Sequence, residues 1–296
     1  MGSRARQLLI AVVGMSLVVT GAVVPGRALA SGVIVVNTVA NENNNDGDCS
    51  LREAVSSANT DSSYDGCTAG SGTDTIVLPK GTLRLDSRLI VSHPLTIRGA
   101  GRGRTVIDAE QTDRVLLVDR ASLSLQRLRV TGGKAASDGG GISVLGGTLV
   151  LLEVSVTGNR TGEDGGGIAM SDGGVLRVTR SLVADNVAGG GGGGISAAGV
   201  VGGRTASVSV VESAVASNQA DTSSGSSAGG GGIHLARASV LSLIRSTVSD
   251  NRANIGAGIA NDSRAKLLNS TISQNSALGS GARGGGLHNS GNAVLT

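Results

Sequence analysis

The stretch Ala188-Gly-Gly-Gly-Gly-Gly-Gly-Ile195-Ser196 holds six consecutive glycines, and it is either a flexible linker or a set of turns. Glycine supplies 49 of the 296 residues, so this distinction decides whether the chain folds. Glycine-rich sequence without a period is typical of disorder, whereas glycines at a fixed spacing indicate turns. The run belongs to a series in which glycines precede an aliphatic residue: Ile142, Ile168, Ile195, Ile233, Ile259 and Leu287.

The intervals between these aliphatic residues are 26, 27, 38, 26 and 28 residues. Each interval has room for two or three short strands rich in β-branched residues, and it lacks an apolar period of 3.6 residues. Repeats of this length form solenoids, propellers or arrays, and strands this short fit one coil of a parallel β-helix. Every interval also contains an asparagine that we expect to stack from coil to coil: Asn159, Asn186, Asn218, Asn251 and Asn275.

Alignment of the units on this asparagine predicts three further columns. The residue ten places earlier is apolar and is expected to point inward: Leu149, Leu176, Val208, Leu241 and Ala265. The residue three places earlier is also apolar in every unit: Val130, Val156, Val183, Val215, Val248 and Ile272. The residue six places earlier alternates in charge and predicts an outer ladder of opposite charges: Arg127, Glu153, Arg180, Glu212, Arg245 and Asn269.

A solenoid exposes its apolar core at each end and therefore needs a cap. Residues 31–70 are expected to supply the cap, and residues 71–296 the β-helix. Ser50 and Glu53 fit a capping box at the start of a helix. The apolar residues of this helix fall on one face: Leu51, Ala54, Val55 and Ala58.

The first 30 residues are typical of a secretory signal, with Arg4 and Arg6 before an apolar run that ends near Ala28-Leu-Ala30. The alternative, a membrane anchor, is disfavoured because the run is short for a spanning helix and is followed by Pro25-Gly26. The mature chain is then expected to be secreted, extracellular or held at the cell surface, without a membrane span.

The chain has two cysteines, Cys49 and Cys67, and export would expose both to oxidising conditions. In an oxidising compartment we expect them to form a disulfide, which would contribute roughly 3 kcal/mol by restricting the unfolded chain. The alternative is a pair of free buried thiols.

The amino-acid composition argues against nucleic-acid and membrane partners and indicates an aliphatic core. Without the three arginines of the signal, 22 basic residues balance 22 acidic ones, which gives no basic footprint for nucleic acid or an anionic membrane. The chain has no Phe, no Trp and a single tyrosine, Tyr64, so the core must be aliphatic. Sugar-binding grooves usually present aromatic faces, and their near absence disfavours a glycan-cleaving cleft.

The run Cys49-Ser-Leu-Arg-Glu-Ala54 resembles the signature of the CSLREA family of secreted bacterial β-helix proteins. Companion segments over residues 67–79, 94–101 and 105–108 extend the resemblance, which begins near Val33. The later repeats resemble pectate-lyase-like β-helices and polymorphic outer-membrane-protein repeats. The resemblance implies a right-handed parallel β-helix on the cell exterior, but it does not imply a reaction.

Two groups of residues are candidates for chemistry. Asp138 and Asp164 should stack on adjacent coils with Glu163 beside them, and Ca²⁺ could relieve their repulsion. The alternative is that these carboxylates bond their own turns and face water. His234 and His288 are expected about 10 Å apart on the coil spacing, too far for one metal ion, and to be solvated. No cofactor and no catalytic residue is otherwise predicted.

The function that these features favour is a non-catalytic adhesion, matrix or glycan-contacting module, which binds a polysaccharide or protein outside the cell. The alternative is a polysaccharide lyase or glycoside hydrolase of the pectate-lyase-like type.

The 38-residue interval carries extra residues at 197–205 and 219–228, which we expect to protrude, to be mobile and to form the contact surface. The sequence stops inside a predicted strand at Thr296, so we expect an incomplete last coil that self-associates or continues in a longer protein.

Overall fold

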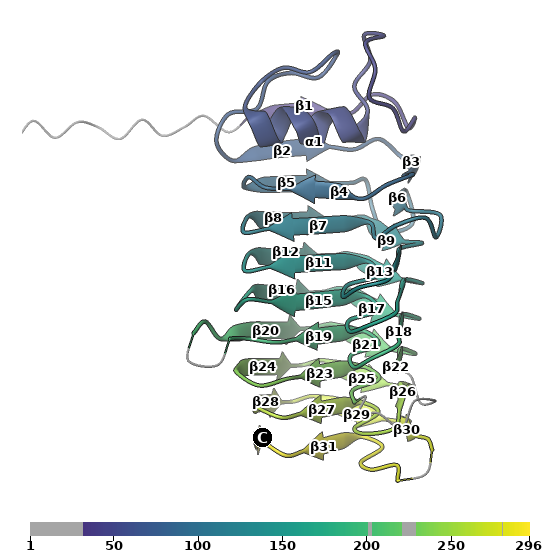
Figure 1. Cartoon of the computed structure of the whole chain (residues 1–296), viewed down its shortest axis with the longest axis vertical. Coiled ribbons are helices and arrows are strands. Elements are labelled where there is room, and N and C mark those ends of the chain that lie inside the picture. The colour runs from purple at the N-terminus through teal and green to yellow at the C-terminus, as the bar shows by residue number, and fades with distance from the viewer. Residues whose placement is uncertain (1–31, 201–202, 221–228, 280) are drawn as a thin grey trace, which may run out of the picture.

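The computed structural model describes residues 32–200, 203–220, 229–279 and 281–296, so the predicted signal sequence lies outside the described residues. Over these ranges the chain winds into stacked coils of parallel strands, with helix α1 (Leu51–Thr60) at one end (Figure 1). This is the predicted right-handed parallel β-helix. In the part of the chain that the structure describes, no helix has the length and apolar character needed to cross a membrane.

Four sheets run along the coil axis, and two of them are described first. The long sheet contains, in hydrogen-bonded order, β1 (Val33–Val35), β2 (Asp74–Val77), β5 (Leu95–Arg98), β8 (Ser122–Gln126), β12 (Thr148–Leu152), β16 (Val175–Thr179), β20 (Ala206–Val211), β24 (Ser239–Ile244), β28 (Arg264–Leu268) and β32 (Asn292–Leu295). The valine sheet contains β3 (Gly81–Arg84), β6 (Thr105–Asp108), β9 (Arg129–Thr131), β13 (Ser155–Thr157), β17 (Leu182–Ala184), β21 (Ala214–Ala216), β25 (Thr247–Ser249) and β29 (Thr271–Ser273).

The other two sheets lie on either side of the glycine runs. The alanine sheet contains β10 (Lys134–Ala135), β14 (Arg160–Thr161), β18 (Val187–Ala188), β22 (Gln219–Ala220), β26 (Arg252–Ala253) and β30 (Ser276–Ala277). The isoleucine sheet contains β4 (Leu89–Val91), β7 (Leu116–Asp119), β11 (Ile142–Leu145), β15 (Ile168–Ser171), β19 (Ile195–Ala197), β23 (Ile233–Leu235), β27 (Ile259–Asn261) and β31 (Leu287–Asn289).

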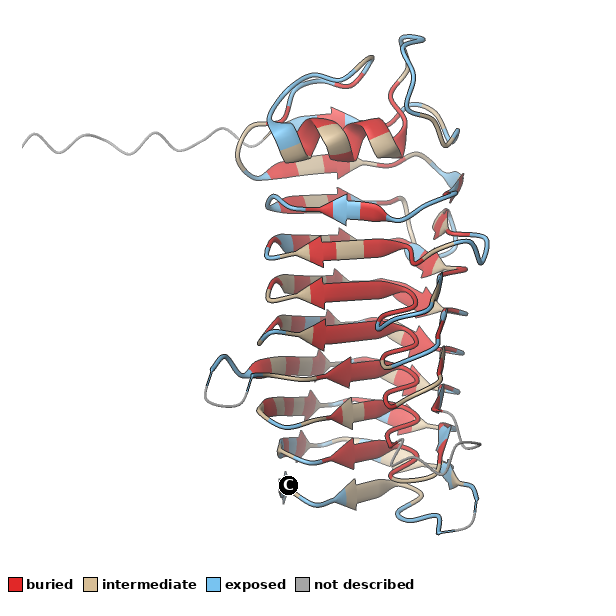
Figure 2. Ribbon diagram, in the orientation of Figure 1, coloured by how far each residue is buried: buried red, intermediate tan, exposed pale blue. Residues whose placement is uncertain are grey.

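The core is aliphatic and follows the predicted columns. Leu176 pairs with Leu149 on one side and with Val208 on the other, and all three side chains are buried. In the valine sheet Val183 pairs with Val156 and Val215, which are also buried. Figure 2 shows this buried interior continuing through the stack from coil to coil.

The glycine runs and the asparagine column form one packing unit. The glycine three places before the aliphatic residue has a positive φ, as at Gly192 (φ +67°), which fits the predicted turn. The glycine directly before the aliphatic residue lies against the asparagine of the same coil. A Cβ on Gly194 would stand 2.9 Å from Nδ2 of Asn218 and 2.7 Å from the carbonyl oxygen of Gly232. Only a residue without a side chain fits at this position.

The asparagine amides bond along the coil axis. Nδ2 of Asn186 donates to Oδ1 of Asn218 at 2.9 Å, and Nδ2 of Asn218 donates to Oδ1 of Asn251 at 3.0 Å. Each Oδ1 also accepts from the backbone N–H of the preceding asparagine, at 3.1 Å for Asn186. Asn159 and Asn275 continue the ladder at its two ends. Asn159, Asn186, Asn218 and Asn251 are buried, so their amides satisfy groups that water cannot reach.

A second ladder, of serines in the turns that precede the valine sheet, was not predicted. The hydroxyl oxygen of Ser213 accepts from the N–H of Ser181 at 3.0 Å, and that of Ser246 accepts from the N–H of Ser213 at 3.2 Å. The serine hydroxyls therefore pair backbone groups that the sheets leave free.

The charge ladder is present on the outside of the same turns. Glu153 lies 4.0 Å from Arg127 and 3.7 Å from Arg180, and Glu212 lies 2.7 Å from Arg245. These side chains are about half exposed, so each pair contributes roughly 0.2 to 1 kcal/mol. All of them, together with Asn269, have positive φ values, so they also form the turn between the long and valine sheets.

The cap has the predicted elements. Ser50 and Glu53 form a capping box at the start of α1. The helix packs against β1, β2 and β4, with Leu51 2% exposed. The disulfide between Cys49 and Cys67 is formed, and both residues are buried.

The enlarged coil and the last coil differ from their neighbours. In the connection from β19 to β20, residues 198–200 and 203–205 extend from the stack in Figure 1. Within the two predicted loops, residues 201–202 and 221–228 lie outside the described residues, so the predicted mobility stays a prediction. In the last coil Val294 and Leu295 are 58% and 65% exposed.

Candidate functional site

The structure places Asp138 and Asp164 on adjacent coils, in the turns before β11 and β15. Oδ1 of Asp138 accepts from the N–H of Asp164 at 3.0 Å, and Oδ1 of Asp164 accepts from the N–H of Gly191 at 2.6 Å. Each carboxylate thus satisfies the backbone of the next coil. Glu163 is exposed beside them. A calcium ion at Asp138, Glu163 and Asp164 stays a prediction.

The two histidines of the repeat region line one hollow of about 380 Å³, together with Arg237 and Asp262. His234 on β23 and His288 on β31 are two coils apart, and Ala260 stands between them. The side chain of His234 is only 15% exposed, which differs from the solvated histidine that we expected.

The contacts of His234 are incomplete. Its Nε2 lies 3.6 Å from Oδ2 of Asp262, which is an ion pair only when the imidazole is protonated. Its Nδ1 is buried and has no hydrogen-bond partner. Oδ1 of Asp262 accepts from the hydroxyl of Ser290. The hollow therefore offers imidazole and carboxylate groups, with Arg237 beside them, to a polar ligand.

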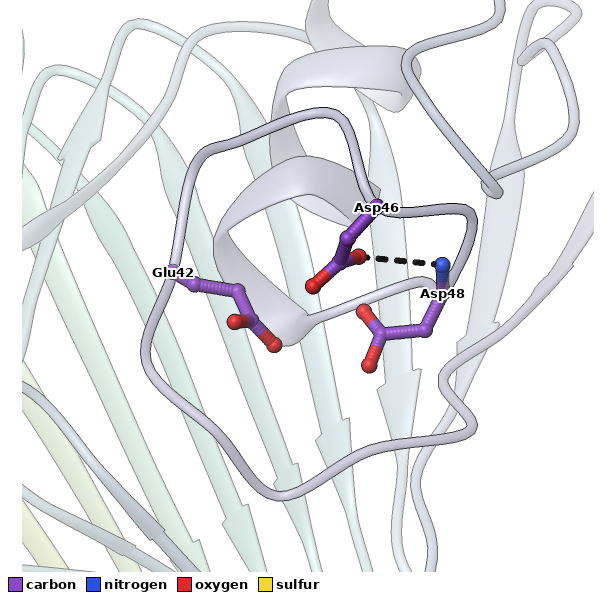
Figure 3. A group of neighbouring side chains, drawn as sticks. All are labelled: Glu42, Asp46 and Asp48. Carbon is purple, nitrogen blue, oxygen red and sulfur yellow. Dashed lines mark hydrogen bonds between the residues drawn. The ribbon is translucent and has the colours of Figure 1, made fainter.

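Carboxylates also converge in the cap, at the loop that leads into α1. Side-chain oxygens of Glu42, Asp46 and Asp48 all lie within 4.8 Å of one another. In Figure 3 the three carboxyl groups point toward a common centre inside the loop, and Oδ1 of Asp46 accepts from the N–H of Asp48 at 3.2 Å. A second group of three, Asp48, Glu53 and Asp65, satisfies the same criterion.

The fold brings these carboxylates together by two routes. Glu53 belongs to α1, and its oxygens accept from the N–H of Asn44 at 3.0 Å and of Ser50 at 2.9 Å. Asp65 comes from the other arm of the disulfide loop, and its carboxylate accepts from the N–H of Gly47 at 3.1 Å. The helix start and the disulfide thus fix opposite sides of the loop.

The neighbouring carboxylates of this loop repel one another. Partial burial and the neighbouring carboxylates of Asp48 and Asp46 raise the pKa of Glu42. Partial burial, followed by the charges of Asp46 and Glu53, raises the pKa of Asp48. Oδ1 of Asp48 is inaccessible to solvent and has no hydrogen-bond partner.

The sequence contains a signal that would have found this loop. Glu42, Asn44, Asp46, Gly47 and Glu53 occupy positions 1, 3, 5, 6 and 12 of the pattern D-x-[DN]-x-[DN]-G-x5-E, with Glu in place of Asp at the first position.

Comparisons with known proteins are limited. No family model and no curated protein matches the chain, so the CSLREA resemblance rests on its motif and stays a prediction. The crystal structure of pectate lyase Pel9A is similar, with 11% identity, 91% of this chain and 78% of that chain covered, and a TM-score of 0.47. Likeness at this level carries no information about activity. The chain is a right-handed parallel β-helix with a disulfide-bonded helical cap.

Proposed function

We propose that this protein is a secreted, non-catalytic β-helix module that contacts a polysaccharide at the cell exterior. The observation that carries the proposal is the hollow at His234, Arg237, Asp262 and His288. Ligand sites are concave and present a few convergent polar groups, and this hollow offers hydrogen-bond donors and acceptors that sugar hydroxyls and carboxylates can use.

The position of the hollow agrees with this function. Gly229, which directly follows the second inserted segment of the enlarged coil, lines it. The column of residues that pairs with His234 along the isoleucine sheet continues through Ser196, Ala169 and Ser143. These three residues are small and buried. Larger polar side chains enter this column only at His234 and His288, so we expect ligand contacts at this end of the sheet.

The geometry favours binding over catalysis. At 3.6 Å, His234 and Asp262 are farther apart than the partners of a formed acid-base pair. Asp262 is also bonded to Ser290. No hydrogen bond therefore joins the imidazole of His234 to a carboxylate that would orient it as a general base.

A panel of neutral, uronate-containing and sulfated polysaccharides tests the proposal on the purified mature chain. We expect binding without products, and we expect His234→Ala to weaken it while His93→Ala, at an exposed histidine outside the hollow, leaves it unchanged. Release of unsaturated or reducing sugars that His234→Ala abolishes would overturn the non-catalytic assignment in favour of a lyase or hydrolase. Absence of binding to the whole panel would overturn the polysaccharide assignment.

A further inference from the structure

We propose that the loop of residues 42–53 in the cap is a Ca²⁺-binding site, with Glu42, Asp46 and Asp48 as its carboxylate ligands. Their oxygens already lie within 4.8 Å of one another, although like charges at this distance repel. Among the ion pairs of the described residues, none joins a lysine or arginine to these three carboxylates. A bound cation would supply the missing positive charge.

Oδ1 of Asp48 is an independent indication of a ligand. It is inaccessible to solvent and accepts no hydrogen bond. Figure 3 shows the carboxyl group of Asp48 directed toward those of Asp46 and Glu42. A buried carboxylate oxygen without a donor costs free energy unless something else neutralises it. A metal ion at the centre of the group would coordinate this oxygen.

The sequence pattern of the loop matches a known way of holding calcium. In 12-residue calcium loops, side chains at positions 1, 3 and 5 and a Glu at position 12 are ligands, and a Gly at position 6 permits the sharp turn. Here Gly47 stands at position 6 with φ +94°, and Glu53 stands at position 12, where its two oxygens accept from the N–H groups of Asn44 and Ser50. Asp48 stands at position 7, which contributes a backbone carbonyl in such loops, so a side-chain ligand there departs from the pattern. Helix α1 begins at position 10, so Glu53 is carried on the first turn of the helix.

Asn44 stands at position 3 and contacts two of the three carboxylates. Its Nδ2 donates to Oε2 of Glu42 and to Oδ2 of Asp46, both at 3.2 Å. The amide thus bridges two carboxylates in the way a cation would. Rotation of the amide by 180° would present Oδ1 instead, which is the atom that a cation requires.

The ligand chemistry selects the cation. The donors are carboxylate and amide oxygens without imidazole or thiolate, which is the set that hard cations prefer. The loop is polar and partly exposed, and Ca²⁺ accepts six to eight oxygens in irregular geometry, whereas Mg²⁺ demands a near-ideal octahedron. We therefore assign Ca²⁺, with a Kd on the order of 10⁻⁴ to 10⁻³ M, as in extracellular modules.

Binding would strengthen the cap. The same loop carries the N-cap Ser50, whose hydroxyl donates to the carbonyl oxygen of Glu42 at 2.9 Å. A ligand that binds only the folded state raises stability with its concentration. Ca²⁺ would therefore raise the temperature at which α1 detaches from the first coil.

The chain offers a built-in reporter for the test. Tyr64 is the only aromatic residue other than the histidines, and it directly precedes Asp65 in the cap. Tb³⁺ bound in the loop should therefore luminesce on tyrosine excitation, and Ca²⁺ should displace it. Tb³⁺ bound at Asp138 and Asp164, several coils away, should give no such signal. Tyr64→Leu should remove the luminescence and keep the Ca²⁺-dependent rise in Tm.

Variants of the mature chain then locate the site. Asp48→Asn should weaken Ca²⁺ binding by about tenfold or more, because ligand charge sets affinity. Glu42→Gln, on the partly exposed side of the loop, should act in the same direction. Asp172→Asn, at an exposed turn that also has a positive φ, is the matched control and should change nothing.

The stability of Asp48→Asn without calcium distinguishes a metal ligand from a residue that only supports the fold. In EDTA, Asp48→Asn should be at least as stable as the wild type, because it removes a repelled carboxylate. The proposal is overturned if 10 mM CaCl₂, about ten times the weakest expected Kd, leaves Tm unchanged. It is equally overturned if Asp48→Asn keeps full Tb³⁺ luminescence, or if Mg²⁺ raises Tm as much as Ca²⁺ does.

Discussion

At Gly194 the backbone passes so close to the amide of Asn218 that a methyl group would not fit. The same contact recurs at Gly167 with Asn186 and at Gly232 with Asn251. The asparagine at this position therefore requires a glycine opposite it. The asparagine ladder supplies hydrogen bonds in a buried strip, and the glycine gives the ladder its space.

Gly194→Ala should consequently destabilise the protein. The new Cβ would stand 2.7 to 3.0 Å from the carbonyl oxygen of Gly232 and the amide of Asn218, and such overpacking costs about 1 to 3 kcal/mol. Gly103→Ala is the control, since nothing lies within 4 Å of its Cβ position, and it should leave the free energy of unfolding nearly unchanged. Chemical denaturation measures both. Equal losses in the two variants would show that the close contact with the ladder is not the cause.

At the scale of elements, α1 seals the first coil. Leu51, Ala54 and Val55 are buried against it, and the disulfide holds the segment that follows the helix. Arg52 on the outer side donates to Oδ1 of Asp86 at 3.0 Å and to the carbonyl oxygen of Ser87 at 2.9 Å. The cap is thus held by apolar burial, one covalent link and a polar clamp.

Leu51→Asp should place a charge against apolar surface and lower thermal stability by several kcal/mol. The double change Cys49→Ser with Cys67→Ser should cost roughly 3 kcal/mol, by loss of the loop constraint. The β-rich circular dichroism of the folded fraction should persist in both. Ser63→Asp, at an exposed position just beyond the helix, is the matched control for the charge. Unchanged melting temperatures in both cap variants would mean that α1 does not close the core.

The polar clamp predicts a pH dependence. Hydrogen bonds from Asn41 and Ser87, together with the charge of Arg52, hold the pKa of Asp86 below its ordinary value. A lowered pKa contributes stability at pH values above the ordinary pKa and loses it as the pH falls through the lowered one. Asp86→Asn should therefore destabilise by at most about 1 kcal/mol at pH 7, because the carboxylate is 74% exposed. The difference from the wild type should vanish in acid, and a difference that persists below pH 2 would contradict the ionic origin.

At the scale of the whole molecule, each coil contacts only its neighbours, so stability and function are separable along the axis. The carboxylate loop of residues 42–53 lies in the cap, and the hollow at His234 lies near the other end. The enlarged coil borders the hollow through Gly229 and differs from its neighbours mainly in the length of its connections.

Shortening the connection between β19 and β20 tests this separation. Residues 198–205 can be replaced by Asp-Gly-Gly, the sequence that joins β15 to β16 in the preceding coil as residues 172–174. We expect the free energy of unfolding to stay within about 0.5 kcal/mol, since surface changes of this kind are usually that small. Polysaccharide binding should weaken, most of all when residues 221–228 are also removed. Full binding by a chain that lacks both segments would exclude them from the contact surface.

The sequence by itself determined the features that repeat or are local. Parallel stacking places the same position of each unit in one column, so the spacing of Asn186 and Asn218 revealed both the coil and the ladder. The capping box of Ser50 and Glu53 spans four residues and needs no tertiary information. Periodicity and short-range geometry are properties of the chain itself.

Only the tertiary structure decided which side chains from different columns and segments meet. Asp65 reaches the loop at Gly47 because the disulfide folds one arm onto the other, and the repeat carries no trace of that contact. His234 and His288 share a hollow with Asp262 because Ala260 leaves room between them. Spacing gives the separation of the coils along the axis, but the direction in which a side chain leans depends on the volume of its neighbours.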